Sequence, residues 1–203
     1  MKTAQKVDLY REHKKEYAAS RKPVLVEVGP ATYLSISGQG APGGSAFSDA
    51  IGALYGVAFT VKMTRKSAGR KDYVIHKLEA LWPNLACDGA MPDKNQWTWQ
   101  LLIRTPRFVA RSEVTKAIAV LLKRGKSAEV QRVSLASIEE GLCVQALHVG
   151  PYEDEVATVA MMRSIAEAKG LRFYGIHHEI YLSDPRRVAP EKLKTILRHP
   201  VRR

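Results

Sequence analysis

Cysteine is scarce in this sequence, and the spacings typical of metal sites are missing from it. The 203 residues include only Cys87 and Cys143, which lie far apart and have no partner spacing. The six histidines show no His/Cys ligand spacing, and the neighbours His177 and His178 would point to opposite faces of a strand. We therefore expect two reduced thiols, no bound metal and no cofactor.

Long apolar runs are also missing. No stretch of about 18 apolar residues occurs, so the sequence predicts no membrane-spanning helix. The first residues are polar and charged, without the apolar segment of a secretory signal. These observations predict a cytoplasmic protein with no membrane partner. With 45% hydrophobic residues, the chain is long enough for one full core or for two small fused modules.

The formal net charge of +12 raises the question of a nucleic-acid partner. The basic residues do not form one stripe; they collect at 2–22, 62–71, 123–126 and 186–203. The sequence contains no recognisable helix-turn-helix, zinc finger or aromatic RNA-binding motif. We therefore favour a solvated basic surface without a specific nucleic-acid partner. A protein that associates with nucleic acid through its basic ends stays open as a third functional hypothesis.

The stretch Phe173-Tyr-Gly-Ile-His-His-Glu-Ile-Tyr-Leu-Ser-Asp-Pro185 organises the rest of the chain. β-Branched and aromatic residues dominate it and a Ser-Asp-Pro turn ends it, which predicts a strand. Strand side chains alternate between two faces, so His177, Glu179 and Tyr181 share one face. A carboxylate beside aromatics suits a pocket for a cationic or polar aromatic ligand. A solvent-facing surface with an ion pair is the alternative interpretation.

An earlier stretch, 72–83, repeats this design. It also begins with an aromatic residue, carries a central acid and ends at a proline. At an offset of 100 residues, Glu79 matches Glu179 and Leu81 matches Tyr181. A helical pattern precedes each stretch, so we predict two copies of one supersecondary unit.

Each copy is predicted to be a βαββ module inside a single domain of residues 1–203, which gives an α+β fold with antiparallel sheets. The elements of the first module, 24–105, are expected at 24–37, 45–64, 73–82 and 96–104. Those of the second, 128–203, are expected at 142–149, 154–169, 172–182 and 194–201, after a strand candidate at 130–135. A helix at 112–124 within the connection 106–127 bridges the modules, and a basic segment, 1–22, precedes them.

Two further groups of side chains stand beside these elements. Trp97 and Trp99 share one face of the 96–104 strand, where they form either core or the aromatic wall of a cleft. Glu153, Asp154 and Glu155 stack acids at the N-terminus of the 154–169 helix, where the helix dipole favours negative charge.

Several segments spread over nearly the whole chain carry a resemblance to a known family. They include Val26-Glu-Val-Gly-Pro30, Leu78-Glu-Ala-Leu-Trp82, Trp97-Thr-Trp99, Arg104-Thr-Pro106, His148-Val-Gly-Pro-Tyr-Glu153 and Glu179-Ile-Tyr-Leu-Ser-Asp-Pro185. In these segments the chain resembles stand-alone GyrI-like small-molecule-binding proteins, whose relatives include the DNA gyrase inhibitory protein and effector domains of multidrug-responsive regulators.

The resemblance implies a tandem pair of βαββ modules about a pseudo-twofold axis, with a ligand cleft between them. It implies that Glu179 is the buried glutamate of that cleft, with Glu79 as its counterpart from the first module. The residues expected to bind ligand are Glu79, Trp82, Trp97, Trp99, Tyr33 and His177. The partner implied is a small hydrophobic or cationic aromatic molecule, bound by a monomer or a dimer.

The first functional hypothesis is a module that binds or senses such compounds. The second, which the resemblance to some stand-alone members implies, is a hydrolase that opens cyclopropane-containing, DNA-alkylating compounds. In that case Glu179 would position or deprotonate a water molecule, and Tyr181 or Tyr152 would donate a proton to the carbonyl-derived oxygen. The residues alone leave binding and catalysis both open.

Overall fold

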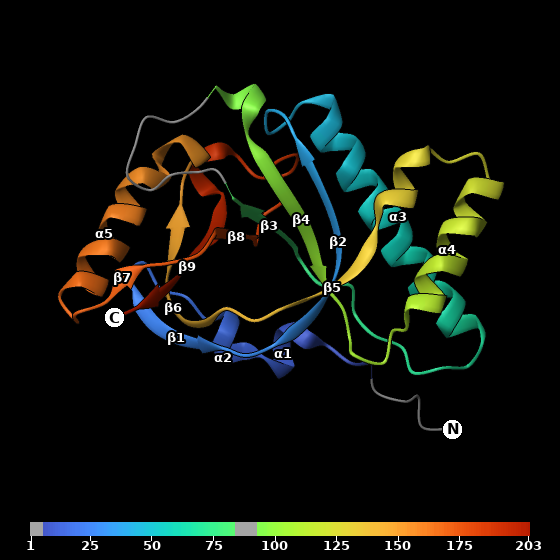
Figure 1. The fold of residues 1–203 in the computed structure, drawn as a ribbon, viewed down its shortest axis with the longest axis horizontal. Helices are drawn as coiled ribbons and strands as arrows, with labels where there is room; N and C mark the ends of the chain where they lie inside the picture. Colours follow the sequence, from blue (N-terminus) through green and yellow to red (C-terminus); the bar gives the residue numbers. More distant parts are fainter. Residues whose placement is uncertain (1–5, 84–92) are drawn as a thin grey trace.

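A computed structural model describes residues 6–83 and 93–203 as an antiparallel sheet flanked by helices (Figure 1). The strands are β1 (Val24–Val28), β2 (Ala31–Gln39), β3 (Leu78–Trp82), β4 (Thr98–Arg104), β5 (Ser134–Ile138), β6 (Gly141–Val149), β7 (Arg172–Phe173), β8 (His177–Tyr181) and β9 (Lys194–Arg202). The α-helices are α1 (Leu9–Glu12), α2 (Lys14–Tyr17), α3 (Ser45–Ser67), α4 (Arg111–Lys123) and α5 (Glu155–Glu167). Among them, none has both the length and the apolar character needed to cross a membrane. Cys143 is a buried free thiol, whereas Cys87 lies outside the described residues.

The sheet order is β1-β6-β9-β8-β3-β4-β2-β5, with β7 added beside β9. Every pairing between the strands named above is antiparallel, which confirms the predicted α+β class. The strands of the first predicted module run β3-β4-β2 outward from the middle, and those of the second run β8-β9-β6. The two modules thus share one strand order and meet where β3 pairs with β8. Their superposition about a twofold axis stays a prediction.

The outermost strands are exchanged between the two halves. β1, which runs directly into β2, pairs with β6 of the other half, and β5, which runs into β6, pairs with β2. Each half therefore completes the sheet of the other. Because the pairings are long-range in sequence, this exchange makes the two halves one interdependent fold.

Two predicted strands are wrong in part. The predicted strand 172–182 is broken between β7 and β8, where Gly175 has a φ of +78°, a conformation that glycine adopts without the steric cost of a side chain. The predicted strand 73–82 begins only at Leu78. Its first residue, Tyr73, forms instead an isolated parallel bridge with Val7 of the N-terminal segment.

The strand candidate at 130–135 is also wrong in part. A short 3₁₀ helix occupies Ala128–Arg132, and β5 begins at Ser134. Ser127 caps this turn by accepting a hydrogen bond from the backbone N–H of Glu129. This cap stabilises a helical turn at a position where the β-branched residues had suggested a strand.

Cross-strand partners share one face of a sheet, so the register divides the side chains between two faces. Ala80 pairs with Glu179, and Glu179 pairs with Leu197, so these three side chains lie on the same face. This side, which we name the helix face, packs under α3 around Ala80 and under α5 around Leu197. The opposite side, which we name the N-terminal face, is covered by α1 and α2, whose Tyr17 packs on Ile180. Figure 1 shows α5 at one end of the molecule and α3 with α4 at the other.

Gly38 in β2 provides the space for the buried ring of Trp99. A Cβ atom added at Gly38 would lie 2.5 and 2.7 Å from two ring carbons of Trp99 and closer still to a third. We expect Gly38→Ala to lower the free energy of unfolding by about 1–3 kcal/mol, because the indole has to leave its packing position. Urea unfolding at equilibrium measures the change.

The matched control is Gly52→Ala on the exposed side of α3. No atom lies within 4 Å of a Cβ added there, and a helix-interior glycine costs about 0.5–1 kcal/mol relative to alanine. This variant should therefore be more stable than the wild type. Equal behaviour of the two variants would contradict the packing argument.

Candidate functional site

Three of the predicted site residues come from alternate positions of β8 and lie together on the helix face. His177, Glu179 and Tyr181 are largely buried, and Glu179 is only 6% exposed. The Tyr181 hydroxyl donates a 2.6 Å hydrogen bond to Oε2 of Glu179. The imidazole Nε2 of His177 lies 3.5 Å from Oε1 of Glu179. The predicted sharing of a face is therefore present in the structure, with direct contacts along it.

Glu155 joins this group from the first turn of α5, and sequence reasoning missed it. Its carboxyl hydrogen-bonds to that of Glu179, and burial followed by the charge of Glu179 raises the pKa of Glu155 well above its usual range. Glu155 is therefore protonated at neutral pH and does not supply the negative charge that would stabilise the helix dipole. The signal that could have found it is the buried stripe of α5: Glu155, Thr158, Met162 and Ala166 recur at helical spacing.

Tyr152 forms the exposed edge of the same group. It lies in the 3₁₀ turn Tyr152–Asp154 before α5, is 36% exposed, and places its ring edge-to-face with Tyr181 at 6.0 Å between centroids. Burial and then the charge of Glu179 raise the pKa of Tyr152 to about 12. Its hydroxyl therefore keeps its proton at neutral pH and is available as a donor. We name Tyr152, Glu155, His177, Glu179 and Tyr181 the helix-face cluster.

The tryptophans lie on the same face of the sheet, at the neighbouring strands. Trp82 pairs with His177 across β3 and β8 and is 3% exposed. Its indole packs edge-to-face against Trp97 at 5.7 Å and stacks with Phe47 of α3 at 5.9 Å. Trp99 is buried in the same aromatic group, 5.3 Å from Phe47. Trp99 is thus a core residue. Trp97, which directly precedes β4, is half-buried and therefore more accessible than Trp99.

Glu79 and Tyr33 do not belong to this group, and the expectation that Glu79 and Glu179 share one space is wrong. Glu79 pairs with Ile180, the residue after Glu179, so its side chain lies on the N-terminal face. Glu79 is fully buried there and accepts a 3.1 Å hydrogen bond from the hydroxyl of Tyr17. Tyr33 shares that face, packed with Leu81 and 1% exposed.

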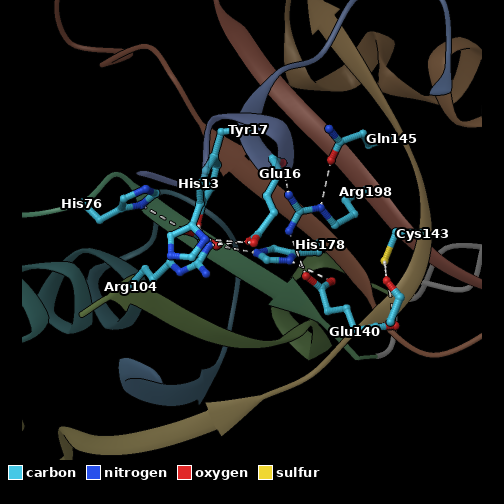
Figure 2. Close-up of polar contacts among 12 residues, drawn as sticks. His13, Glu16, Tyr17, His76, Arg104, Glu140, Cys143, Gln145, His178 and Arg198 are labelled. Carbon is cyan, nitrogen blue, oxygen red and sulfur yellow. Dashed lines mark hydrogen bonds and ion pairs between the residues drawn. The ribbon is translucent and has the colours of Figure 1, made fainter. Parts of the chain in front are cut away.

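The N-terminal face holds a buried network of ionic side chains that the sequence did not predict (Figure 2). His178 lies between two acids, with 3.0 Å from Nε2 to Glu79 and 3.0 Å from Nδ1 to Glu140. Burial alone would lower the pKa of His178, but Glu140 and Glu79 raise it to about 9, so the ring is charged at neutral pH. Arg198 is fully buried and donates a 2.9 Å bond to Glu140.

The same network holds the N-terminal segment on the sheet. Arg104 pairs with Glu16 of α2 and also donates to the hydroxyl of Tyr17 at 3.1 Å. Arg198 donates to the backbone carbonyl of Glu16, and Gln145 donates to that of Ala18 at 2.9 Å. Three carboxylates therefore face three cations in one buried layer. We interpret this layer as structural, because its contacts join neighbouring strands of the sheet and fix α2 with the residue that follows it.

Two hollows of the described surface lie outside the helix-face cluster, and one of them is lined by His76, whose Nδ1 lies 3.1 Å from Oε1 of Glu79. One, of about 260 Å³, is lined by Asp8, Tyr10, Arg11 and residues 74–77. The other, of about 640 Å³, lies between α3 and α4. Glu179 lines neither of them, so the predicted ligand cleft stays a prediction. The position of the helix-face cluster is nevertheless distinctive, because β3 and β8 lie between the strands that α3 covers and those that α5 covers.

Residues 105–202 match the model of the GyrI-like small molecule binding domain. Over their whole length, two crystal structures from Listeria innocua are similar to this chain. One is an uncharacterized conserved protein (40% identity, 97% of this chain and 100% of that chain, TM-score 0.90), and the other is described as a hydrolase (40% identity, the same coverage, TM-score 0.88). The C-terminal domain of EcmrR is 13% identical over 89% of this chain and 97% of its own, with a TM-score of 0.56, and so shares the fold alone.

No curated protein matches the chain. The TM-scores of 0.90 and 0.88 show that this chain and the two Listeria proteins share one fold. Over residues 105–202 the chain is similar to the GyrI-like small-molecule-binding family, and binding of a small molecule is the function that this similarity supports.

Proposed function

We propose that this protein binds hydrophobic or cationic aromatic compounds at the helix-face cluster. The observation that carries the proposal is the hydrogen bond of a 6% exposed carboxylate, Glu179, with Tyr181, whose ring in turn contacts the partly exposed Tyr152. A carboxylate removed from water attracts a cation strongly, because solvent no longer screens it. The faces of the two phenol rings add a cation–π attraction.

The location of the cluster supports the proposal. Its strand members lie on β8, which pairs with β3 in the middle of the sheet, between the strands that α3 covers and those that α5 covers. Trp82 and Trp97 extend an aromatic surface from the same face. An apolar surface with a few converging polar groups is the usual composition of a small-molecule site.

The binding proposal is tested with Glu179→Gln and a cationic triarylmethane dye such as crystal violet. We expect at least about a tenfold loss of affinity, because the amide keeps the shape and removes the charge. Quenching of tryptophan fluorescence, checked by calorimetry, measures the dissociation constant. A neutral aromatic compound of similar size should lose less affinity in the same variant.

The matched control is Glu153→Gln, an exposed acid two residues before Glu155. It removes the same charge from a side chain exposed to solvent outside the cluster, so dye affinity should stay close to the wild-type value. Equal losses in the two variants would mean that the dye responds to net charge and not to this site.

Hydrolysis is the second candidate function, and the description of Listeria relatives as hydrolases favours it. For a cyclopropane fused to a dienone, Glu179 takes a proton from water while the water oxygen bonds to the ring carbon. The strained C–C bond breaks, its electron pair moves to the carbonyl oxygen, and Tyr152 donates a proton there. The hydroxyl of Tyr181 already donates a hydrogen bond to Glu179, so Tyr152 is better placed to act as the general acid.

A further inference from the structure

The helix-face cluster contains the donor atoms of a metal site. Glu155, His177 and Glu179 each offer one ligand atom, and these three atoms lie within 4.8 Å of one another. The side chains come from the start of α5 and from two alternate positions of β8. All three residues are at least nine-tenths buried. Two carboxylates and an imidazole converge here in a space closed to bulk water.

Some of these donor atoms have no partner within the described part of the chain. Oε1 of Glu155 and Nδ1 of His177 are buried without a hydrogen bond there. The ion pairs described for these carboxylates include no lysine or arginine, and His177 is the basic group that faces Glu179. Unpaired buried polar atoms are uncommon in folded proteins and often mark the place of a water or an ion.

We propose that Glu155, His177 and Glu179 bind a divalent transition-metal ion, with Zn²⁺ as the best match to the donor set. One imidazole and two carboxylates are ligands that Zn²⁺ accepts, and three protein ligands leave a fourth position for water or another molecule. Tetrahedral ligands about 2.1 Å from the ion lie about 3.4 Å apart, so side chains within 4.8 Å need to move inward by about 1 Å.

The surroundings fit such an ion. The hydroxyl of Tyr181, at 2.6 Å from Oε2 of Glu179, holds that carboxylate as an outer hydrogen bond to a metal ligand would. Mg²⁺ and Ca²⁺ require more oxygen ligands than the three side chains supply, and both disfavour imidazole. The sequence did not predict the site, because two of its ligands lie in β8 and the third lies in α5, more than 20 residues earlier in the chain. The inference shares Glu179 with the proposed function, but it rests on the donor atoms of Glu155, His177 and Glu179 and not on the aromatic rings.

Zinc binding is measured on the full-length protein after treatment with a chelator and removal of that chelator. We expect calorimetry and equilibrium dialysis to show one Zn²⁺ per chain, and Co²⁺ to give the visible absorption of a tetrahedral site. Mg²⁺ should show no binding under the same conditions. Glu155→Gln and His177→Gln should each weaken zinc binding at least about tenfold, because each removes one ligand and keeps a side chain that can hydrogen-bond.

Glu153→Gln is the control and should bind zinc as the wild type does. Thermal unfolding without metal shows whether each variant is folded, and Glu155→Asp provides a second test should Glu155→Gln fail to fold, since its shorter carboxylate should also weaken binding. Absence of stoichiometric zinc in the wild type overturns the proposal. So does zinc binding that both ligand variants leave unchanged, which would assign the ion to a different site. Dye binding with the chelator present tests the aromatic site separately.

Discussion

Replacing Arg198 with methionine should lower the free energy of unfolding by about 3–5 kcal/mol, because removing one partner leaves a buried charge uncompensated. Arg198 is fully buried, and it donates to Glu140 at 2.9 Å and to Gln145 at 3.0 Å. Methionine fills a similar length but donates nothing. Glu140 then keeps only His178, and the carbonyl of Glu16 loses its donor. Urea unfolding followed by tryptophan fluorescence measures the loss.

The matched control is Arg186→Met on the surface. Arg186 makes an ion pair of the same length, 2.9 Å, with Asp184, but its side chain is 85% exposed. Water and salt screen such a pair, so the midpoint of unfolding should stay close to the wild-type value. A comparable shift in both variants would show that burial of the network adds nothing to its contribution.

The positions of most strands along the chain followed from local patterns, but the exchange of β1 and β5 between the halves did not. Alternating side chains and glycine or proline breaks place most strands within a few residues of where they lie. Which strand pairs with which is a long-range choice, made by the whole sheet. The turns at Gly29-Pro30 and before Gly141 mark only that each strand ends, not that the next one continues in the other half.

The helix-face cluster was predicted in part because its β8 members obey the strand period of two. Glu155 was missed because three consecutive acids suggested charges that complement the helix dipole, whereas the burial of one of them depends on its long-range contact with Glu179 of β8. The buried network of the N-terminal face could not be predicted, because its members come from six separate segments of the chain. No spacing in the sequence joins Glu16 to Arg104 or Glu140 to Arg198.

The error over Glu79 has a geometric cause. Both helices lie on one face, so corresponding positions of the two halves must also share a face. The offset of 100 matches Glu79 with Glu179, but the register places these two residues on opposite faces. A match shifted by one residue, Ala80 with Glu179, keeps the faces together. Sequence similarity favoured a match of Glu79 with Glu179, whereas the sheet register requires Ala80 to correspond to Glu179.

Glu179→Gln should lower kcat/KM for ring opening of a cyclopropane-fused dienone by about 10²–10⁴-fold, if the second candidate function holds, because the amide cannot accept the proton of water. Tyr152→Phe should cause a loss in the same range, since it removes the donor to the carbonyl oxygen. Tyr181→Phe should have a smaller effect, because its hydroxyl is bonded to Glu179 and orients that carboxylate. Chromatography of the ring-opened alcohol measures turnover, and ¹⁸O-labelled water identifies the source of its oxygen.

Measuring substrate binding and turnover together in these variants separates the two candidate functions. Turnover lost with binding retained in Glu179→Gln assigns this carboxylate to the chemical step, and binding lost together with turnover assigns it to recognition. Glu153→Gln should turn over substrate at the wild-type rate, since its side chain is exposed to solvent outside the cluster. Wild-type protein that binds the dienone but releases it unopened would reject the hydrolase and leave the binding function. Full turnover by Glu179→Gln would show that the reaction, wherever it occurs, does not use the helix-face cluster.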